Sequence, residues 1–185
     1  MLLRPIGLSL ALLLTAAPVA AQTNPPPPAA TPTEPRETIE GTLSQDRTVI
    51  AIPALATASA QTVAGLRTDS LGRQIAEVIA ADLERSGLYD PMGPSGIPAI
   101  GRAEVQAPRF AEWQSRNAEN VVHGFVDANG TGGLVVGCYL YDTALGSELV
   151  RKGFEIQPGD WRRAAHKCAD AIYSRLSGES PFFDS

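Results

Sequence analysis

The chain has 185 residues, with 15 Lys and Arg against 20 Asp and Glu and a formal net charge of −5. This acidic balance argues against a nucleic-acid binder or an anionic-membrane binder, because both ligands attract basic surfaces. The length is sufficient for one domain that buries a single hydrophobic core.

The first 21 residues predict a secretory signal that is absent from the mature protein. Arg4 supplies a short positive region, residues 6–14 are apolar, and residues 18–21 form a small-residue cleavage site before Gln22. The apolar run is short for a membrane span, and an uncleaved N-terminal anchor is the alternative interpretation. Export places the protein in the periplasm, a compartment in which disulfides form.

Residues 22–37 are rich in Pro, Ala and Thr, with consecutive prolines at 25–28. Proline lacks an amide donor and favours an extended backbone, so this composition predicts a semi-rigid, solvated tail. A simple linker is one interpretation, and a Pro-rich docking motif is the other.

Residues 38–185 predict an α/β domain, a mixed sheet of about five strands with two main helices packed on it. Apolar β-branched runs mark the strands, and turn residues separate one strand from the next. Amphipathic stripes mark the helices. We expect strands at 38–43 (a short edge strand), 48–52, 88–91, 120–127, 134–141 and 148–156, helices at 70–86, 109–116 and 161–176, and loops at 53–67 and 92–106.

Thr68 or Asp69 is a candidate N-cap of the first helix, and Gly87 is its candidate C-terminal glycine. Asp82 lies inside the apolar stripe of this helix, and a buried carboxylate must be paired or hydrogen-bonded. We expect it to accept backbone amides of a neighbouring loop. A catalytic acid would need a second titratable partner, and Glu84 points elsewhere on the helix.

The last predicted helix follows Asp160, a candidate N-cap, and ends before Gly178, a candidate left-handed C-cap. A helical wheel gives it one apolar face and one polar face. The apolar face carries Trp161, Ala164, Ala165, Cys168, Ile172 and Leu176, and the polar face carries Arg162, Arg163, His166, Lys167, Asp170 and Ser174.

Cys138 and Cys168 are the two cysteines, one on an inward-facing strand position and one on the apolar face of the last helix. A disulfide between them is one interpretation, and two buried thiols are the other. A zinc site built from these cysteines with His123 and His166 is disfavoured, because the spacing matches no zinc motif. His166 and Cys168 also point away from each other on the wheel.

His166 and Asp170 are four residues apart on the polar face, with Tyr173 beside them. Such a pair orients an imidazole for general-base chemistry, but no nucleophile is placed for it. A surface hydrogen bond or ion pair is the simpler interpretation. We expect no catalytic, cofactor-binding or metal-binding residue in this chain.

The final helix has the pattern W-x4-H-x3-D-x2-Y-x2-L-S-G, which resembles the end of the N-terminal domain of the TolB family. Earlier segments resemble the same domain in the same order, so the resemblance covers residues 38–183. These segments are residues 50–53, 72–89, 110–113, 121–124 and 140–142.

The resemblance implies a protein-interaction module of the Tol–Pal system, which supports envelope integrity and cell division. In the family a six-bladed β-propeller follows this helix, and this chain stops about where the propeller is expected to begin. The family engages the C-terminal domain of TolA through its flexible mature N-terminus, and Pal mainly through the propeller. The expected partner-binding residues are therefore Gln22, Thr23, Asn24, Thr38, Ile39 and Glu40.

The resemblance also offers a third interpretation of the polar face of the last helix. His166, Asp170 and Tyr173 would rest against the propeller in a whole family protein and form an interdomain face. The alternative function is a small periplasmic ligand-binding or hydrolytic domain with the same fold. A deep pocket with convergent polar groups around His166 or Asp82 would favour that alternative.

Overall fold

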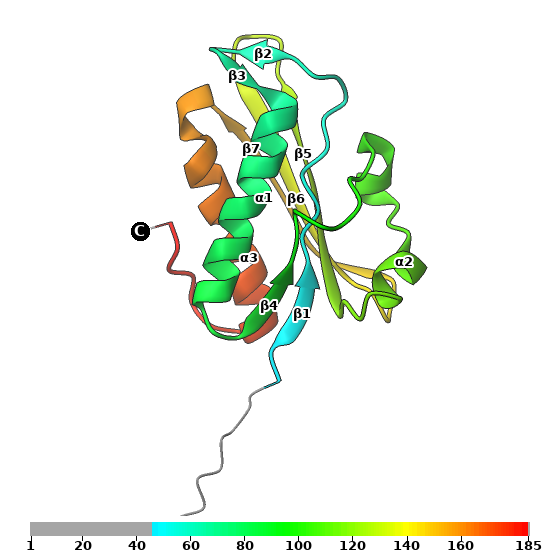
Figure 1. The fold of residues 1–185 in the computed structure, drawn as a ribbon. Helices are drawn as coiled ribbons and strands as arrows, with labels where there is room; N and C mark the ends of the chain where they lie inside the picture. The colour runs from blue at the N-terminus through cyan, green and yellow to red at the C-terminus, as the bar shows by residue number, and fades with distance from the viewer. Residues whose placement is uncertain (1–45, 185) are drawn as a thin grey trace, which may run out of the picture. The chain divides into compact units, whose positions relative to one another are not determined.

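The computed structural model describes residues 46–184, in which five strands form one mixed sheet (Figure 1). This confirms the predicted mixed sheet with two main helices. The predicted edge strand at 38–43 lies outside the described residues. The sheet order is β4 (Tyr89–Met92), β1 (Thr48–Ala51), β5 (Asn120–Ala128), β6 (Leu134–Asp142) and β7 (Ser147–Ile156), and the helices are α1 (Thr68–Arg85), α2 (Phe110–Gln114) and α3 (Trp161–Ser177).

The short strand β1 lies inside the sheet and runs parallel to both of its neighbours, β4 and β5. Such parallel pairs need a crossover connection, and α1 supplies it between β1 and β4. Strands β5, β6 and β7 are consecutive antiparallel strands joined by glycine-containing turns, as the sequence predicts. Pro91 lies on β4, an edge strand, which is where a sheet tolerates a residue without an amide donor.

The helices α1 and α3 lie side by side and cover one face of the sheet (Figure 1). Apolar side chains of both helices and of the strands meet there and are fully buried, among them Ile50, Ile75, Ile79, Leu140 and Ile172. At about 25 cal/mol for each Å² of apolar surface removed from water, this packing is the main driving force of the fold.

A second, smaller core lies on the opposite face of the sheet, under the 3-10 turn η1 (Arg102–Gln106) and α2. Trp113 of α2 is fully buried there, in the same apolar cluster as Tyr139 and Tyr141 of β6. Both faces of the sheet are therefore covered, which explains why β5 and β6 are nearly continuous buried runs.

The predicted N-cap position is right for α3 and wrong for α1. Arg67 is the N-cap of α1, and its own side chain makes no capping bond, whereas Oδ1 of Asp69 accepts the amide of Ser70 at 2.9 Å in the first turn. The hydroxyl of Thr68 is instead buried and accepts the backbone amide of Gln61 at 3.1 Å. Asp160 is the N-cap of α3, as predicted, although its backbone has φ −92° and ψ 9° and its side chain makes no capping bond.

The C-terminal ends of both main helices agree with the prediction. Gly87 follows α1 with φ +78°, and Gly178 follows α3 with φ +76°. A residue with a side chain is strained in this left-handed region, so glycine is the residue that ends these helices at least cost.

Two predicted loops contain short elements that the sequence pattern does not predict. The hairpin of β2 (Thr62–Val63) and β3 (Leu66–Arg67) lies in the predicted loop 53–67. The turn η1 lies in the predicted loop 92–106. Elements this short have no hydrophobic period, so periodicity cannot reveal them.

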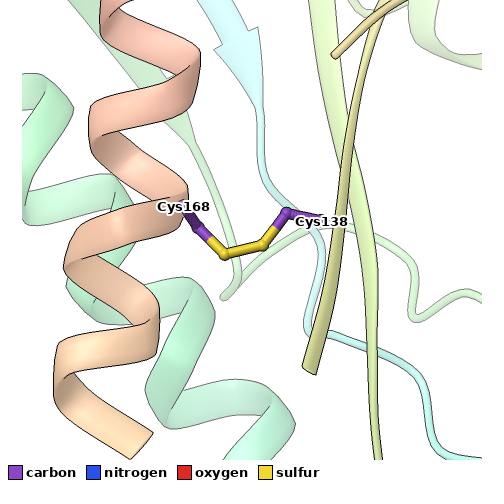
Figure 2. The surroundings of a disulfide bond; sticks show 2 residues. All are labelled: Cys138 and Cys168. Carbon is purple, nitrogen blue, oxygen red and sulfur yellow. A yellow bond between two sulfur atoms is a disulfide. The ribbon is translucent and has the colours of Figure 1, made fainter. Parts of the chain in front are cut away.

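A disulfide joins Cys138 of β6 to Cys168 of α3 in the structure (Figure 2). The two Cα atoms lie 6.1 Å apart, within the range of ordinary disulfides. Both residues are buried in the core beneath the helices. The bond would therefore tie the last helix directly to the centre of the sheet.

We predict that reduction lowers the melting temperature of the purified protein. The cross-link closes a loop of 30 residues, which is worth about 3 kcal/mol in the chain-entropy model. A loss of that size lowers the melting temperature by roughly 10 °C in a domain of this length. Calorimetry with and without reductant measures the shift, and the Cys138→Ala/Cys168→Ala variant is the control that should not respond. Two free thiols in unfolded, unreduced periplasmic protein would show that the bond does not form.

Candidate functional site

A groove of about 460 Å³ runs between α1 and α3 on the outer side of the helix layer. Polar and charged side chains line most of it, and Trp161 forms an apolar part of its wall. The buried carboxylate of Asp82 and the imidazole of His166 meet in this groove. Two residues that the sequence analysis discussed separately therefore come together here.

Asp82 is held by two cationic or hydrogen-bonding partners and not by loop amides. Its Oδ2 lies 2.6 Å from Nδ1 of His166, and its Oδ1 accepts a hydrogen bond from Nη1 of Arg85 at 3.0 Å. The prediction that Asp82 accepts backbone amides is therefore wrong. The side chain of Asp82 is only 2% exposed, so these partners compensate a carboxylate that has lost its water.

The surface pair predicted between His166 and Asp170 is also wrong, because His166 turns toward α1. A helical wheel separates the side that faces the sheet from the side that does not. It does not show that α1 packs along one flank of α3, and His166 lies on that flank. Its side chain is 34% exposed, so it borders the groove while it reaches the buried carboxylate.

Asp170 performs the role that the sequence analysis assigned to Asp82. Its two carboxylate oxygens accept the backbone amides of Phe182, Phe183 and Asp184 at 2.8 to 3.0 Å. Arg163 pairs with Asp184 at 3.1 Å and adds an ion pair to the same contact. The residues after Gly178 are therefore held against α3.

Tyr173 is buried, which corrects its expected place on the polar face. Its ring packs edge-to-face against Tyr89, Phe182 and Phe183, and its hydroxyl donates to Glu179. The hydrogen bond to Glu179 is the main cause that raises the pKa of Tyr173, since the bond stabilises the protonated phenol beside a carboxylate. The three residues proposed as an interdomain face thus have separate contacts, and the face itself stays a prediction.

His123 lies in the second core and is fully buried. Its ring packs edge-to-face on Trp113 and Tyr141, with centroids 5.8 and 5.9 Å away. Nδ1 lies 3.1 Å from the carbonyl oxygen of Glu104, which can only accept, so Nδ1 carries the proton. Burial lowers the pKa of His123, because the charged imidazolium loses its hydration there.

The groove residues can orient an imidazole but offer no hydroxyl or thiol nucleophile. The lining residues are charged, amide or apolar side chains of α1 and α3, without Ser, Thr or Cys. Within residues 46–184 no group of three His, Cys, Asp or Glu side chains is arranged to hold a metal ion. The expected partner-binding residues at 22–24 and 38–40 lie outside the described residues.

The fold defines a class of α/β domain in which two long helices cover one face of a mixed five-stranded sheet. The TolB amino-terminal domain family matches residues 39–149 of the chain. The chain therefore belongs to the TolB family, and the match falls on its N-terminal domain.

Relatives with the same family name extend the similarity to the whole chain. The Tol-Pal system protein TolB of Sphingopyxis alaskensis is 80% identical over 185 residues, which are 100% of this chain and 41% of that protein. Tol-Pal system protein TolB 1 of Novosphingobium aromaticivorans is 52% identical over 180 residues, covering 94% of this chain and 39% of that protein. The chain thus spans about two fifths of the length of these relatives.

A solved structure shows the same fold. The crystal structure of TolB from Acinetobacter baumannii superposes with a TM-score of 0.58 at 22% sequence identity. The superposition covers 75% of this chain and 30% of that protein. At this identity the likeness supports the fold alone.

We predict that Asp82 and His166 are energetically coupled. The expected coupling free energy of unfolding is about 1–2 kcal/mol, below that of a fully buried pair because His166 is partly exposed. Urea denaturation of Asp82→Asn, His166→Gln and the double variant measures it. Strictly additive losses in the double variant would contradict the coupling.

We also predict that burial of His123 makes the protein less stable below about pH 6.5, the ordinary pKa of histidine. The folded state holds a neutral imidazole with a lowered pKa, so the unfolded state binds more protons as the pH falls. The loss approaches about 1.4 kcal/mol for each pH unit between the unfolded and folded pKa values. The His123→Asn variant should lose stability less steeply between pH 6.5 and 5.5, and parallel curves would refute the assignment.

Proposed function

We propose that this domain is a non-catalytic protein-interaction module of the Tol–Pal system. The observation that carries the proposal is the 80% identity of the whole chain to a Tol-Pal system protein TolB. The family match over residues 39–149 supports it independently. The proposed compartment is the periplasm, reached by a signal at residues 1–21.

The proposed partner is the C-terminal domain of TolA, engaged through the mature N-terminal tail. A polar, Pro-rich segment that does not bury a core of its own is suited to ordering on a partner surface. The resemblance assigns Pal mainly to the propeller, so we propose that this chain binds Pal weakly or not at all. Among residues 46–184, no helix is long and apolar enough to span a membrane.

The groove that contains Asp82 and His166 is a feature that favours the alternative, a ligand-binding or hydrolytic domain. A carboxylate that orients an imidazole is one part of a nucleophilic catalyst, but the groove lining supplies no nucleophile. The pair also has a sufficient structural role, because it joins α1 to α3 across their contact. These contacts support the interaction module over the enzyme.

We predict that deletion of residues 22–37 abolishes or strongly weakens the binding of the TolA C-terminal domain. The tail would supply the contacts, and the folded domain alone would not replace them. Isothermal calorimetry of the full mature chain and of the deletion variant measures the difference. The matched control replaces residues 22–37 by a Gly/Ser tail of equal length, which keeps the spacing and removes the side chains. Unchanged affinity in both variants would exclude residues 22–37 as the epitope.

We further predict that residues 22–185 do not retain Pal in a pulldown. The reason is that the family surface for Pal is assigned to a part that follows this domain in the longer relatives. The positive control is a longer relative, the TolB of Sphingopyxis alaskensis, whose capture of Pal would show that the Pal preparation is able to bind. Robust capture of Pal by residues 22–185 would assign a Pal surface to this domain.

A further inference from the structure

Strand β7 forms one edge of the sheet, as Figure 1 shows. It has ten residues, and within residues 46–184 no strand pairs with its outer side. The amides and carbonyls of such an edge are a template for one additional strand.

The other edge of the sheet, β4, is a much poorer template. The amide of Thr48 donates to the carbonyl of Leu88, and the amide of Ile52 donates to the carbonyl of Met92. In this parallel register the backbone of Pro91 faces away from β1, so its nitrogen offers no donor at the outer side. Strand addition is therefore favoured at β7.

A groove of about 380 Å³ lies between the edge of β7 and α3. Four consecutive strand residues, 149–152, line it, so the backbone edge itself borders the groove. On the helix side it is lined by Ala171, Ser174 and Arg175. The first two are small, which leaves space for the side chains of an incoming strand, and the buried hydroxyl of Ser174 has no partner among the described residues.

The groove is basic although the chain as a whole has a net charge of −5. It is lined by Arg151, Lys152 and Arg175 and by no acidic residue. Arg151 is paired with Glu148 at 2.8 Å, whereas Lys152 makes no ion pair within residues 46–184. Arg175 donates only to the carbonyl of Leu149, at 3.3 Å. Two cations therefore stand without a carboxylate beside the edge.

We propose that the groove between β7 and α3 binds an extended acidic segment of a partner protein, which adds to the sheet as a strand. Side chains on one face of this segment would lie against Val150 and Ala171 and must be small or apolar. Acidic side chains would pair with Lys152 and Arg175. This surface is separate from the tail that carries the proposed TolA contact.

Protection of the edge against aggregation is the competing explanation. Charged side chains and bulges serve that purpose in many proteins, and a register shift between β6 and β7 lies at Leu140 and Tyr141. Protection accounts for an exposed Lys152. It does not account for a groove beside α3 with small residues and an unpartnered hydroxyl.

The test titrates a short capped peptide that alternates valine and glutamate into the 15N-labelled full mature chain. We expect amide shift changes at residues 149–152 and at 171, 174 and 175, and an affinity that falls with added salt. The variant K152E/R175E should weaken binding about tenfold or more, because it reverses both unpaired cations. Arg73→Glu, which reverses an exposed cation on α1, is the matched control and should not change affinity.

Two further arms distinguish strand addition from simple charge attraction. A peptide with the same sequence but N-methylated amides should not bind, since it cannot pair with the β7 backbone. Ser174→Leu fills the groove without changing charge and should also block binding, with its melting temperature as the check on folding. The proposal would be overturned if the N-methylated peptide bound as tightly as the unmethylated one, or if Arg73→Glu lost as much affinity as K152E/R175E. Amide shift changes confined to residues away from β7 and α3 would also overturn it.

Discussion

The packing of α1 and α3 on one face of the sheet is the interaction on which the rest of the structure depends. The short strand β1 has only four residues and lies between two parallel neighbours. It therefore forms few hydrogen bonds to the rest of the sheet. Gly72 of α1 approaches the backbone of Leu55 so closely that a side-chain carbon would collide with that carbonyl. This close approach lets the isoleucines of α1 reach the sheet, and it explains why glycine stands inside a helix despite its cost there.

Two side-chain links then fix α3 in the same layer. The cysteine pair joins it to β6, and the contact between Asp82 and His166 joins it to α1. The last described residues fold back on α3 through Asp170. The helix therefore takes part in the core and is also the support for the chain segment that follows it.

Much of this fold could be predicted from the sequence because its main elements are long and strongly patterned. The apolar runs of β5 and β6 and the stripes of α1 and α3 predict their types and nearly their ends. Pairings across the chain could not be predicted. The partner of Asp82 is 84 positions away, and the wheel of α3 contains no information about its helical neighbour. The same limit led to the wrong assignment of Asp170, whose partners belong to a segment that folds back after Gly178.

The groove at Asp82 and His166 contains an oriented imidazole without a nucleophile, and its contacts are those of a helix–helix joint. Within residues 46–184, the edge of β7 offers a partner chain unpaired backbone beside the cationic side chains of Lys152 and Arg175. This edge suits the binding role that we propose for the domain.

Helix α3 is an integral part of the domain core and not a peripheral helix. Native-state hydrogen exchange measures the free energy of opening for each amide and tests this claim most directly. We predict that amides in the middle of α3, around Cys168 and Ile172, exchange with the same free energy as those of β6, so that both open only on global unfolding. Exchange of α3 through a local opening of clearly lower free energy, while β6 stays protected, would contradict this account.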